Sequence, residues 1–594
     1  GAAMAENDDS RMLKLQISGL VGDGFEFEAP ASMLGSELLE MLRERVAQKP
    51  GTRLSLHHEA RMLETQKSLK EQGFLEEADR VGFVSLTYVH SRVDLRLAWA
   101  FLVDSEEVES IEGVSEVCGL QRLDQLRKLP SSLQALTLDW WEVGWLDGLQ
   151  NLRRLSIGDH FNQSLEGVKW PPNLEQLSFG YRFNKPLEVP FPSSLRSLTL
   201  GNDFDLSLDE VKWPQLQSLT LGECFNSSLK GTNLPGSLKS LTFGNKFNKS
   251  LDQVVLPASL ECLHFGEGFD QPLEHVTWPP ALIDLTLSAR FNQRLELLKL
   301  PETLRSLTLG RNFNQNLFWM RWPSSLQTLT LGVFFNQSLE QVKLPNLQSL
   351  TFGYSFNQSL KPVTLPSTLQ HLKLGGGFTQ SLVGVQFPGG LQSLTLGGRN
   401  FRPSLFQDAL PRTLKSLTFG RLFNQNLASV TLPDLDSLTF GDNFNLSLGT
   451  VNLPQSLLHL TLGEKFDFSI VEILWPPNLL SLTFGSNFNQ SLAHVHLPAS
   501  LETLVFGESF NQCVGDLPSN LRSLSFRSSD LVPPFSWPSR LQHLTFAPRS
   551  RQCLERSPAL PEGLETLILG QSQPPQHLPK GLKVFQCADL LLKA

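Results

Sequence analysis

The sequence predicts a small α+β domain followed by a long parallel β-solenoid, and three observations support this prediction. The chain has 594 residues, which is too long for one ordinary compact domain. Apolar residues make up 40% of it and charged residues only 18%, a composition that favours folding over disorder. It contains 40 Phe and 43 Gly but only 3 Tyr, and this bias indicates one short unit copied many times.

The amino-terminal region carries the signals of a small mixed sheet with one helix. Residues 12–20 and 25–29 alternate apolar and polar side chains across a Gly-containing turn, which predicts a β-hairpin. Residues 36–47 place Leu and Val side chains on one face of a helix that begins after Ser36. Strands follow at 53–56 and 81–89, so the expected order is ββαββ.

This region resembles the ubiquitin-like fold over residues 12–91. The resemblance is carried by the opening MLKLQISGL, the helix and the segment LHHEARMLETQKSLKEQGF. No Gly-Gly tail follows Val89, so we expect a built-in module instead of a conjugated modifier. The resemblance implies docking to a partner, with a ubiquitin-pathway adaptor as one alternative function.

Periodicity begins near residue 129, and its marker is a Phe that is usually followed by Asn. This Phe recurs every 21–23 residues, at positions 161, 183, 204, 225, 247, 269, 291, 313, 335, 356, 378, 401, 423, 444, 466, 488 and 510. A period near 22 residues is typical of leucine-rich solenoids. We expect the Phe side chains of successive turns to stack in one buried column, and the following Asn to satisfy backbone groups.

One turn shows how the unit is expected to fold. Within Leu195-x-x-Leu198-x-Leu200 the leucines point inward, whereas the Ser and Thr between them point outward. Gly201 follows the strand and is expected to permit a turn with positive φ. The side chain of Phe204 is then expected to pack into the core on the side of the turn opposite the strand.

The repeating unit resembles the FNIP-repeat family, a relative of the leucine-rich repeats, over residues 129–546. The resemblance is carried by Phe-Asn and by L-P-x-S-L-x-x-L-x-L/F-G, although Gln usually replaces the Ile of the family name. It implies a β-solenoid for protein interaction without catalysis. We expect about 21 strands, from 133–138 to 564–569. Residues 1–11 are expected to be a tag or disordered, 92–128 an N-terminal cap or linker, and 547–594 degenerate repeats with a C-terminal cap.

The outward strand positions form two rows of hydroxyl side chains, broken at a few turns by His, Asp, Lys or Cys. Three explanations are compatible with the rows: ordinary polar strand surface, binding of a protein partner at the breaks, or a repetitive ligand such as ice or a glycan. The candidate binding face comprises Ser197, Thr199, Ser218, Thr220, Ser240, Thr242, His264, Asp284, Thr286, Ser306, Thr308, Thr328, Thr330, Ser349, Thr351, His371, Lys373, Ser393, Thr395, Ser416, Thr418, Ser437, Thr439, His459, Thr461, Ser481 and Thr483.

Several functional classes are disfavoured by the sequence. A net charge of −9 argues against nucleic-acid binding, and no run of about 18 apolar residues predicts a membrane span. The six scattered Cys and the absence of a secretory signal favour a cytoplasmic location. His494 and His496 have no third metal ligand nearby in the sequence. We therefore expect no enzyme activity, metal or cofactor, and a protein partner whose identity the sequence does not give.

Overall fold

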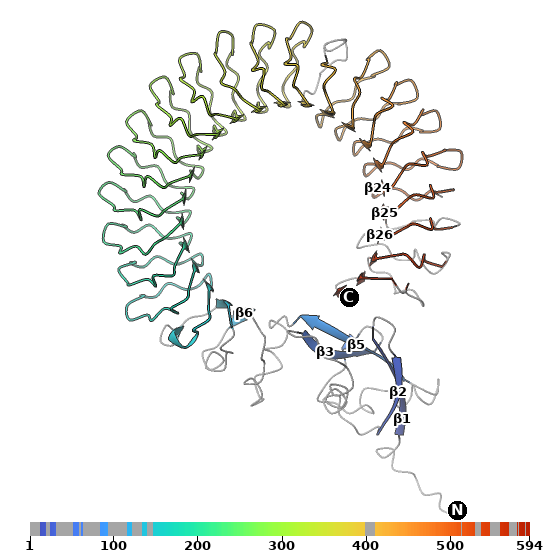
Figure 1. Ribbon diagram of the computed structural model, residues 1–594, viewed down its shortest axis with the longest axis horizontal. Coiled ribbons are helices and arrows are strands. Elements are labelled where there is room, and N and C mark those ends of the chain that lie inside the picture. The colour runs from blue at the N-terminus through green and yellow to red at the C-terminus, as the bar shows by residue number, and fades with distance from the viewer. Residues whose placement is uncertain are drawn as a thin grey trace, which may run out of the picture.

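A computed structural model provides the structure of the chain. The residues that it describes are 12–19, 24–30, 52–58, 61–62, 84–92, 116–120, 133–138, 146–397, 410–512, 514–528, 536–546, 559–569, 579, 581–587 and 590–593. Within these residues, no helix is long and apolar enough to cross a bilayer. The chain contains a small sheet near the amino terminus and a large sheet that curves into a ring (Figure 1).

The small sheet is mixed, as expected, and its strand order is β2-β1-β5-β3-β4. Its strands are β1 (Met12–Gly19), β2 (Gly24–Pro30), β3 (Thr52–His58), β4 (Arg61–Met62) and β5 (Val84–Arg92). The hairpin β1–β2 is antiparallel, and β1 pairs with β5 in parallel. The helix predicted at 36–47 lies outside the described residues, so the ubiquitin-like fold stays a prediction.

The large sheet contains one strand from each turn of the solenoid, and its strands pair in chain order from β6 to β29. Successive strands are parallel except for β29, which pairs antiparallel with β28. The 21 predicted strands are confirmed as β7 to β27. Only one helical segment is found among the described residues, the 3-10 turn η4 (Leu146–Gly148). The strands are β6 (Glu116–Leu120), β7 (Ala135–Leu138), β8 (Arg154–Ile157), β9 (Gln176–Phe179), β10 (Ser197–Thr199), β11 (Ser218–Thr220), β12 (Ser240–Thr242), β13 (Cys262–His264), β14 (Asp284–Thr286), β15 (Ser306–Thr308), β16 (Thr328–Thr330), β17 (Ser349–Thr351), β18 (His371–Leu374), β19 (Ser393–Leu396), β20 (Ser416–Phe419), β21 (Ser437–Thr439), β22 (His459–Thr461), β23 (Ser481–Thr483), β24 (Thr503–Phe506), β25 (Ser523–Phe526), β26 (His543–Phe546), β27 (Thr566–Leu569), β28 (Val584–Cys587) and β29 (Leu590–Lys593).

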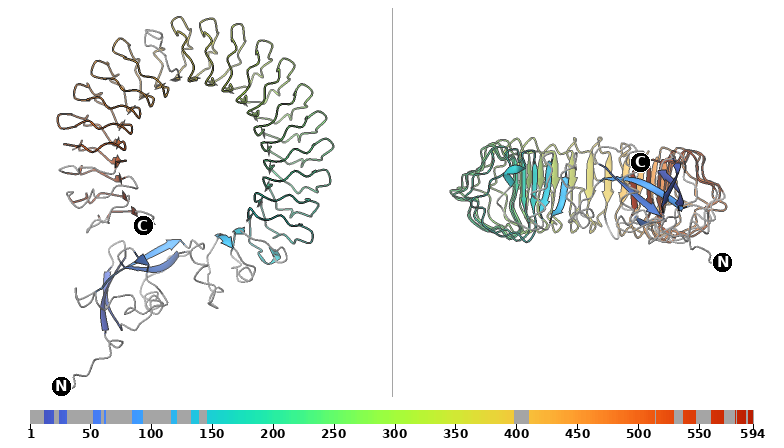
Figure 2. Two further views of the ribbon diagram at one scale, coloured as in Figure 1. Left: turned by 180° about the vertical axis from the view of Figure 1, so that it is seen from behind. Right: turned by 90° about the horizontal axis from the view of Figure 1, so that it is seen from below.

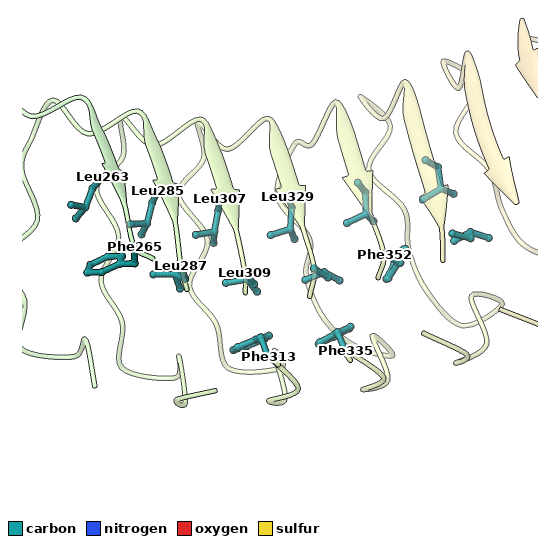
Figure 3. Packing of buried hydrophobic residues seen from close by; sticks show 14 of the residues in the cluster. Leu263, Phe265, Leu285, Leu287, Leu307, Leu309, Phe313, Leu329, Phe335 and Phe352 are labelled. Atoms are coloured by element: carbon teal, nitrogen blue, oxygen red, sulfur yellow. The ribbon is translucent and has the colours of Figure 1, made fainter. Parts of the chain in front are cut away.

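The core runs continuously through the turns, behind the strands. Leu198, Leu200 and Phe204 are each at most 2% exposed, as the pattern predicts. Figure 3 shows the same arrangement farther along, where leucines of neighbouring strands line up above the Phe column. From Phe183 to Phe378 the ring centroids of successive turns lie 5.9–6.4 Å apart and the rings are nearly parallel. The predicted column is therefore confirmed.

The spacing of this column explains why the solenoid curves. Hydrogen-bonded strands lie about 4.8 Å apart, which is less than the separation of the Phe rings behind them. Each turn is therefore a wedge with its narrow end at the strand. Stacked wedges bend the solenoid into a ring with the strands on the inside and the returning segments outside, and edge-on the ring is a flat band (Figures 1 and 2).

The Asn or Asp after most of these Phe residues forms a second ladder between turns. The Oδ1 of Asn314 accepts a hydrogen bond from the backbone N–H of Asn336 at 2.9 Å, and Asn336 accepts one from Asn357 in the same way. Where Thr379 replaces Asn, its N–H still donates to Asn357 at 2.8 Å. These bonds link turns where the chain has no strand, so the expected structural role of the Asn is confirmed.

The glycine that follows most strands has a different role from the one predicted. Gly201 does not adopt positive φ. A Cβ at Gly201 would instead lie 2.2 Å from the carbonyl oxygen of Gly180 in the preceding turn, so the glycines allow successive turns to stack closely. At one turn Ser288 takes this place, and its hydroxyl donates to the carbonyl of Phe269. Positive φ occurs later in the turn, at residues such as Gly167.

Candidate functional site

The inner face of the ring carries the two predicted hydroxyl rows. In strands β10 to β23 the central Leu is buried, and the side chains on either side of it are partly or fully exposed. The registers place equivalent residues beside each other, for example Ser197 beside Ser218 and Thr199 beside Thr220. The structure thus brings all 27 predicted residues to one surface, the inner face. Their binding role stays a prediction.

The first break in the rows is a polar cluster on β13 and β14. The Nε2 of His264 donates a hydrogen bond to Oδ1 of Asp284 at 2.7 Å, and both side chains are partly exposed. Cys262 lies directly beside Asp284 in the register, and the preceding residue Glu261 pairs with Lys239 at 2.9 Å. This cluster offers a neighbouring acid and base where most other turns offer two hydroxyls.

Ionisation within the cluster is coupled. The hydrogen bond to Asp284 raises the pKa of His264, although burial opposes this shift. The same bond lowers the pKa of Asp284, and hydrogen bonds with Ser306 and Thr286 lower it further. The cluster is therefore suited to holding an imidazolium beside a carboxylate, a charge pair that a partner could recognise.

The same cluster lacks the features of a nucleophilic or metal site. Burial raises the pKa of the Cys262 thiol, with smaller contributions from Asp284 and Glu261, and a raised pKa keeps the thiol in its less reactive form. Among the described residues, no group of three or more His, Cys, Asp and Glu side chains could hold a metal ion.

The second break is cationic and lies on β18. His371 and Lys373 are exposed, and they take the places that Ser349 and Thr351 occupy on the neighbouring β17. On β22, His459 is exposed in the same row. The side chains at the breaks are thus longer and more polar than those of the hydroxyl rows, and they project into the space that the ring encloses.

A group of exposed aromatic side chains lies in the same sector of the ring and was not predicted from the sequence. Trp319 is 68% exposed, and its ring meets that of Phe318 edge-on at 4.5 Å between centroids. Phe334 and Tyr354 are exposed after the glycines of successive turns, and Arg311 lies over the ring of Phe334 at 5.6 Å. A comparison of each repeat position across all turns would have identified them, because these positions are mostly polar or small elsewhere.

Comparisons with known proteins agree with the ring. Segments 161–203, 225–268, 291–334, 335–377, 378–421, 423–465, 474–509 and 488–529 match the model of the FNIP Repeat, and together they cover more than half of the chain. The crystal structure of CroV588, a novel circular LRR protein, is 32% identical with a TM-score of 0.58, over 80% of this chain and 83% of that one. YopM from Yersinia enterocolitica is 21% identical with a TM-score of 0.32, over 72% and 90%. No curated protein matches the chain.

Proposed function

Because the chain belongs to the FNIP repeat family and folds as a ring of leucine-rich-repeat type, we propose that it is a non-enzymatic scaffold that binds a protein partner. The observation that carries this proposal is the contrast within the inner face. Most turns present two hydroxyls, whereas β13, β14 and β18 present His, Asp and Lys. Protein interfaces depend on a few such residues surrounded by neutral contacts.

The rigidity of the ring supports the same proposal. Strand pairing, the Phe column and the Asn ladder all connect each turn to the next. A surface that is already ordered loses little conformational entropy when a partner binds. The breaks on β13, β14 and β18 are therefore held at fixed separations along the arc, and only a partner of matching spacing contacts them together.

Site-specific photo-crosslinking tests this function in the whole 594-residue chain. A benzophenone side chain at Lys373, within a break, is compared with one at Thr418, within the hydroxyl rows. We expect a protein partner to crosslink at Lys373 and only weakly at Thr418, in cells that express the chain. Equal crosslinking at both positions, or none from folded protein, would overturn the assignment of the breaks as the binding site.

Binding of ice or a crystalline glycan is disfavoured by the curvature of the sheet. A flat lattice needs a flat array of hydroxyls, but the inner face is concave, so a lattice plane contacts only a few strands at once (Figure 1). A thermal-hysteresis assay checks this directly. Freezing-point depression by the intact ring would support binding of a repetitive ligand such as ice. The ubiquitin-pathway adaptor rests on the resemblance of residues 12–91 alone.

A further inference from the structure

We propose that the outer surface of the ring carries a second binding site, which takes an acidic protein segment with an apolar side chain. The site is the outer patch, which we define as Leu297, Phe318 and Trp319 together with Lys299, Arg321 and Lys343. The inference rests on the proposed function, because it treats the ring as a protein scaffold, and it adds the chemistry of a partner.

The apolar half of the outer patch spans two neighbouring turns. Leu297 and Trp319 each stand six residues after their Phe of the column, at equivalent places in successive turns. They are 70% and 68% exposed, and Phe318 beside Trp319 is 37% exposed. The returning segments that carry them lie on the outside of the ring (Figure 1). Exposed Trp that packs against a neighbouring ring is typical of a binding anchor.

The basic half runs along the same surface. Lys299, Arg321 and Lys343 each stand eight residues after their Phe, in three successive turns, and all three are exposed. None of the three has an ion-pair partner among the residues that the structure describes. These cations are therefore free to pair with carboxylates of a partner.

The net charge of the surrounding residues, 284–373, also favours an acidic partner. Residues 284–373 contain nine Lys and Arg but four Asp and Glu, a net charge of +5, whereas the whole chain carries −9. One basic sector on an otherwise acidic ring attracts an acidic partner to this side and repels it elsewhere.

An acidic protein segment fits the outer patch better than a phosphate polymer or a lipid surface. Glu296 and Glu340 take the place of Phe318 in the turns on either side, so carboxylates alternate with the cations. Closely spaced phosphates would approach these carboxylates and be repelled. A peptide can instead place single carboxylates on the cations and its apolar side chain between Leu297 and Trp319.

Selection from a random peptide library displayed on phage tests the site in the whole 594-residue chain. The same twelve-residue library is selected on the wild-type chain and on K299E/R321E/K343E. We expect the peptides enriched on wild type alone to be rich in Asp and Glu next to an apolar residue. Synthetic copies of these peptides should bind at least about tenfold more weakly to the triple variant and to W319A.

Two matched variants control for general effects of charge and apolar surface. Lys212 is an exposed cation at the equivalent place in another turn, and Val255 is an exposed apolar residue that is 79% accessible. K212E and V255A should bind the selected peptides like wild type. A loss of binding in these controls equal to that in the outer-patch variants would overturn the proposal, because the effect would not be local.

The remaining outcomes separate this site from other ligands and from the inner face. Enriched peptides without an acidic excess, or equal recovery on both proteins, would overturn the outer patch. If the enriched peptides bind H371A/K373A more weakly than wild type, they bind the inner face. The proposed function then stands, and the proposal of a site on the outer patch fails. An oligo-dT strand or phosphatidylserine vesicles that bind wild type, do not bind the triple variant and displace the peptides would assign the patch to phosphate ligands instead.

Discussion

The buried Phe column and the exposed hydroxyl rows repeat with the same period, but packing restricts only the column. Phe291 is fully buried and lies between Phe269 and Phe313, at 6.4 and 6.3 Å. Ser349 and Thr351 are partly exposed on the inner face, with no hydrogen bond from their side chains among the described residues. Repetition in the sequence therefore does not by itself separate positions that are buried in the core from positions that lie on the exposed inner face.

Removing one ring from the column should give the largest loss of stability. We expect Phe291→Ala to lower the free energy of unfolding by about 3–5 kcal/mol, because it leaves a cavity between two stacked rings. Urea denaturation followed by circular dichroism measures this. Ser349→Ala is the matched change on the inner face and should stay within about 0.5 kcal/mol of wild type. Similar losses for both variants would contradict the comparison.

The glycines between strand and Phe give a sharper version of the same test. A Cβ at Gly332 would lie 1.9 Å from the carbonyl oxygen of Gly310, whereas a Cβ at Gly236 would meet no atom within 4 Å. We expect Gly332→Ala to destabilise by about 1–3 kcal/mol, as overpacking does. Gly236→Ala should be neutral or slightly stabilising. A neutral Gly332→Ala variant in thermal denaturation would show that the turns can separate freely.

The Asn ladder should contribute less than the column. The Oδ1 of Asn314 accepts hydrogen bonds from the N–H of Asn336 and from Nε2 of Gln337. Asn314→Ala leaves a partly buried N–H without its acceptor, so we expect a loss of about 1–2 kcal/mol. Asn312 is exposed in the same turn, and Asn312→Ala should have no measurable effect. Faster amide exchange at Asn336 in the first variant alone would confirm the local cause.

The smallest effect concerns the pair His264 and Asp284, whose contribution to stability depends on pH. The raised pKa of His264 means that its contribution is complete below 6.5 and is lost as pH rises through the folded value. The lowered pKa of Asp284 means that its contribution is present above 3.8 and is lost as pH falls through the folded value.

We therefore expect the thermal midpoints of wild type and Asp284→Asn to differ most between about pH 4 and 6.5 and less at pH 8. The other ionisable groups facing the pair are Cys262 and Glu261, and Lys239 already pairs with Glu261. A difference that is constant from pH 4 to pH 8 would show that the pair does not titrate as its hydrogen bond implies.

Most of the solenoid could be predicted from sequence because each turn repeats one local pattern. The L-x-x-L-x-L spacing places Leu198 and Leu200 inside without reference to any distant residue. Three turns have a shorter link before the strand, at residues 213–216, 344–347 and 432–435. In the first of them Leu216 donates to Pro214 instead of to the residue three positions back as Leu195 does, and strand β11 is intact.

The candidate site could be predicted only in part. The outward direction of Ser197 and His371 follows from alternation along a strand, so the inner face was predicted residue by residue. The contact between His264 and Asp284 was not, because it joins residues 20 positions apart whose distance depends on the register of two strands. The outer patch, by contrast, could have been found from the sequence, because Leu297 and Trp319 occupy the same repeat position in successive turns, where most other turns have polar or small residues.

The sequence by itself determined the period, the strands and the buried side chains, because these depend on residues within one turn of about 22 residues. Only the tertiary structure decided the curvature and the role of the glycines. Curvature arises from the difference between the strand spacing and the wider spacing of the Phe rings, and the glycine contact, 2.2 Å at Gly201, exists only between stacked turns. Both depend on the contact between neighbouring repeats, which the sequence of a single repeat does not show.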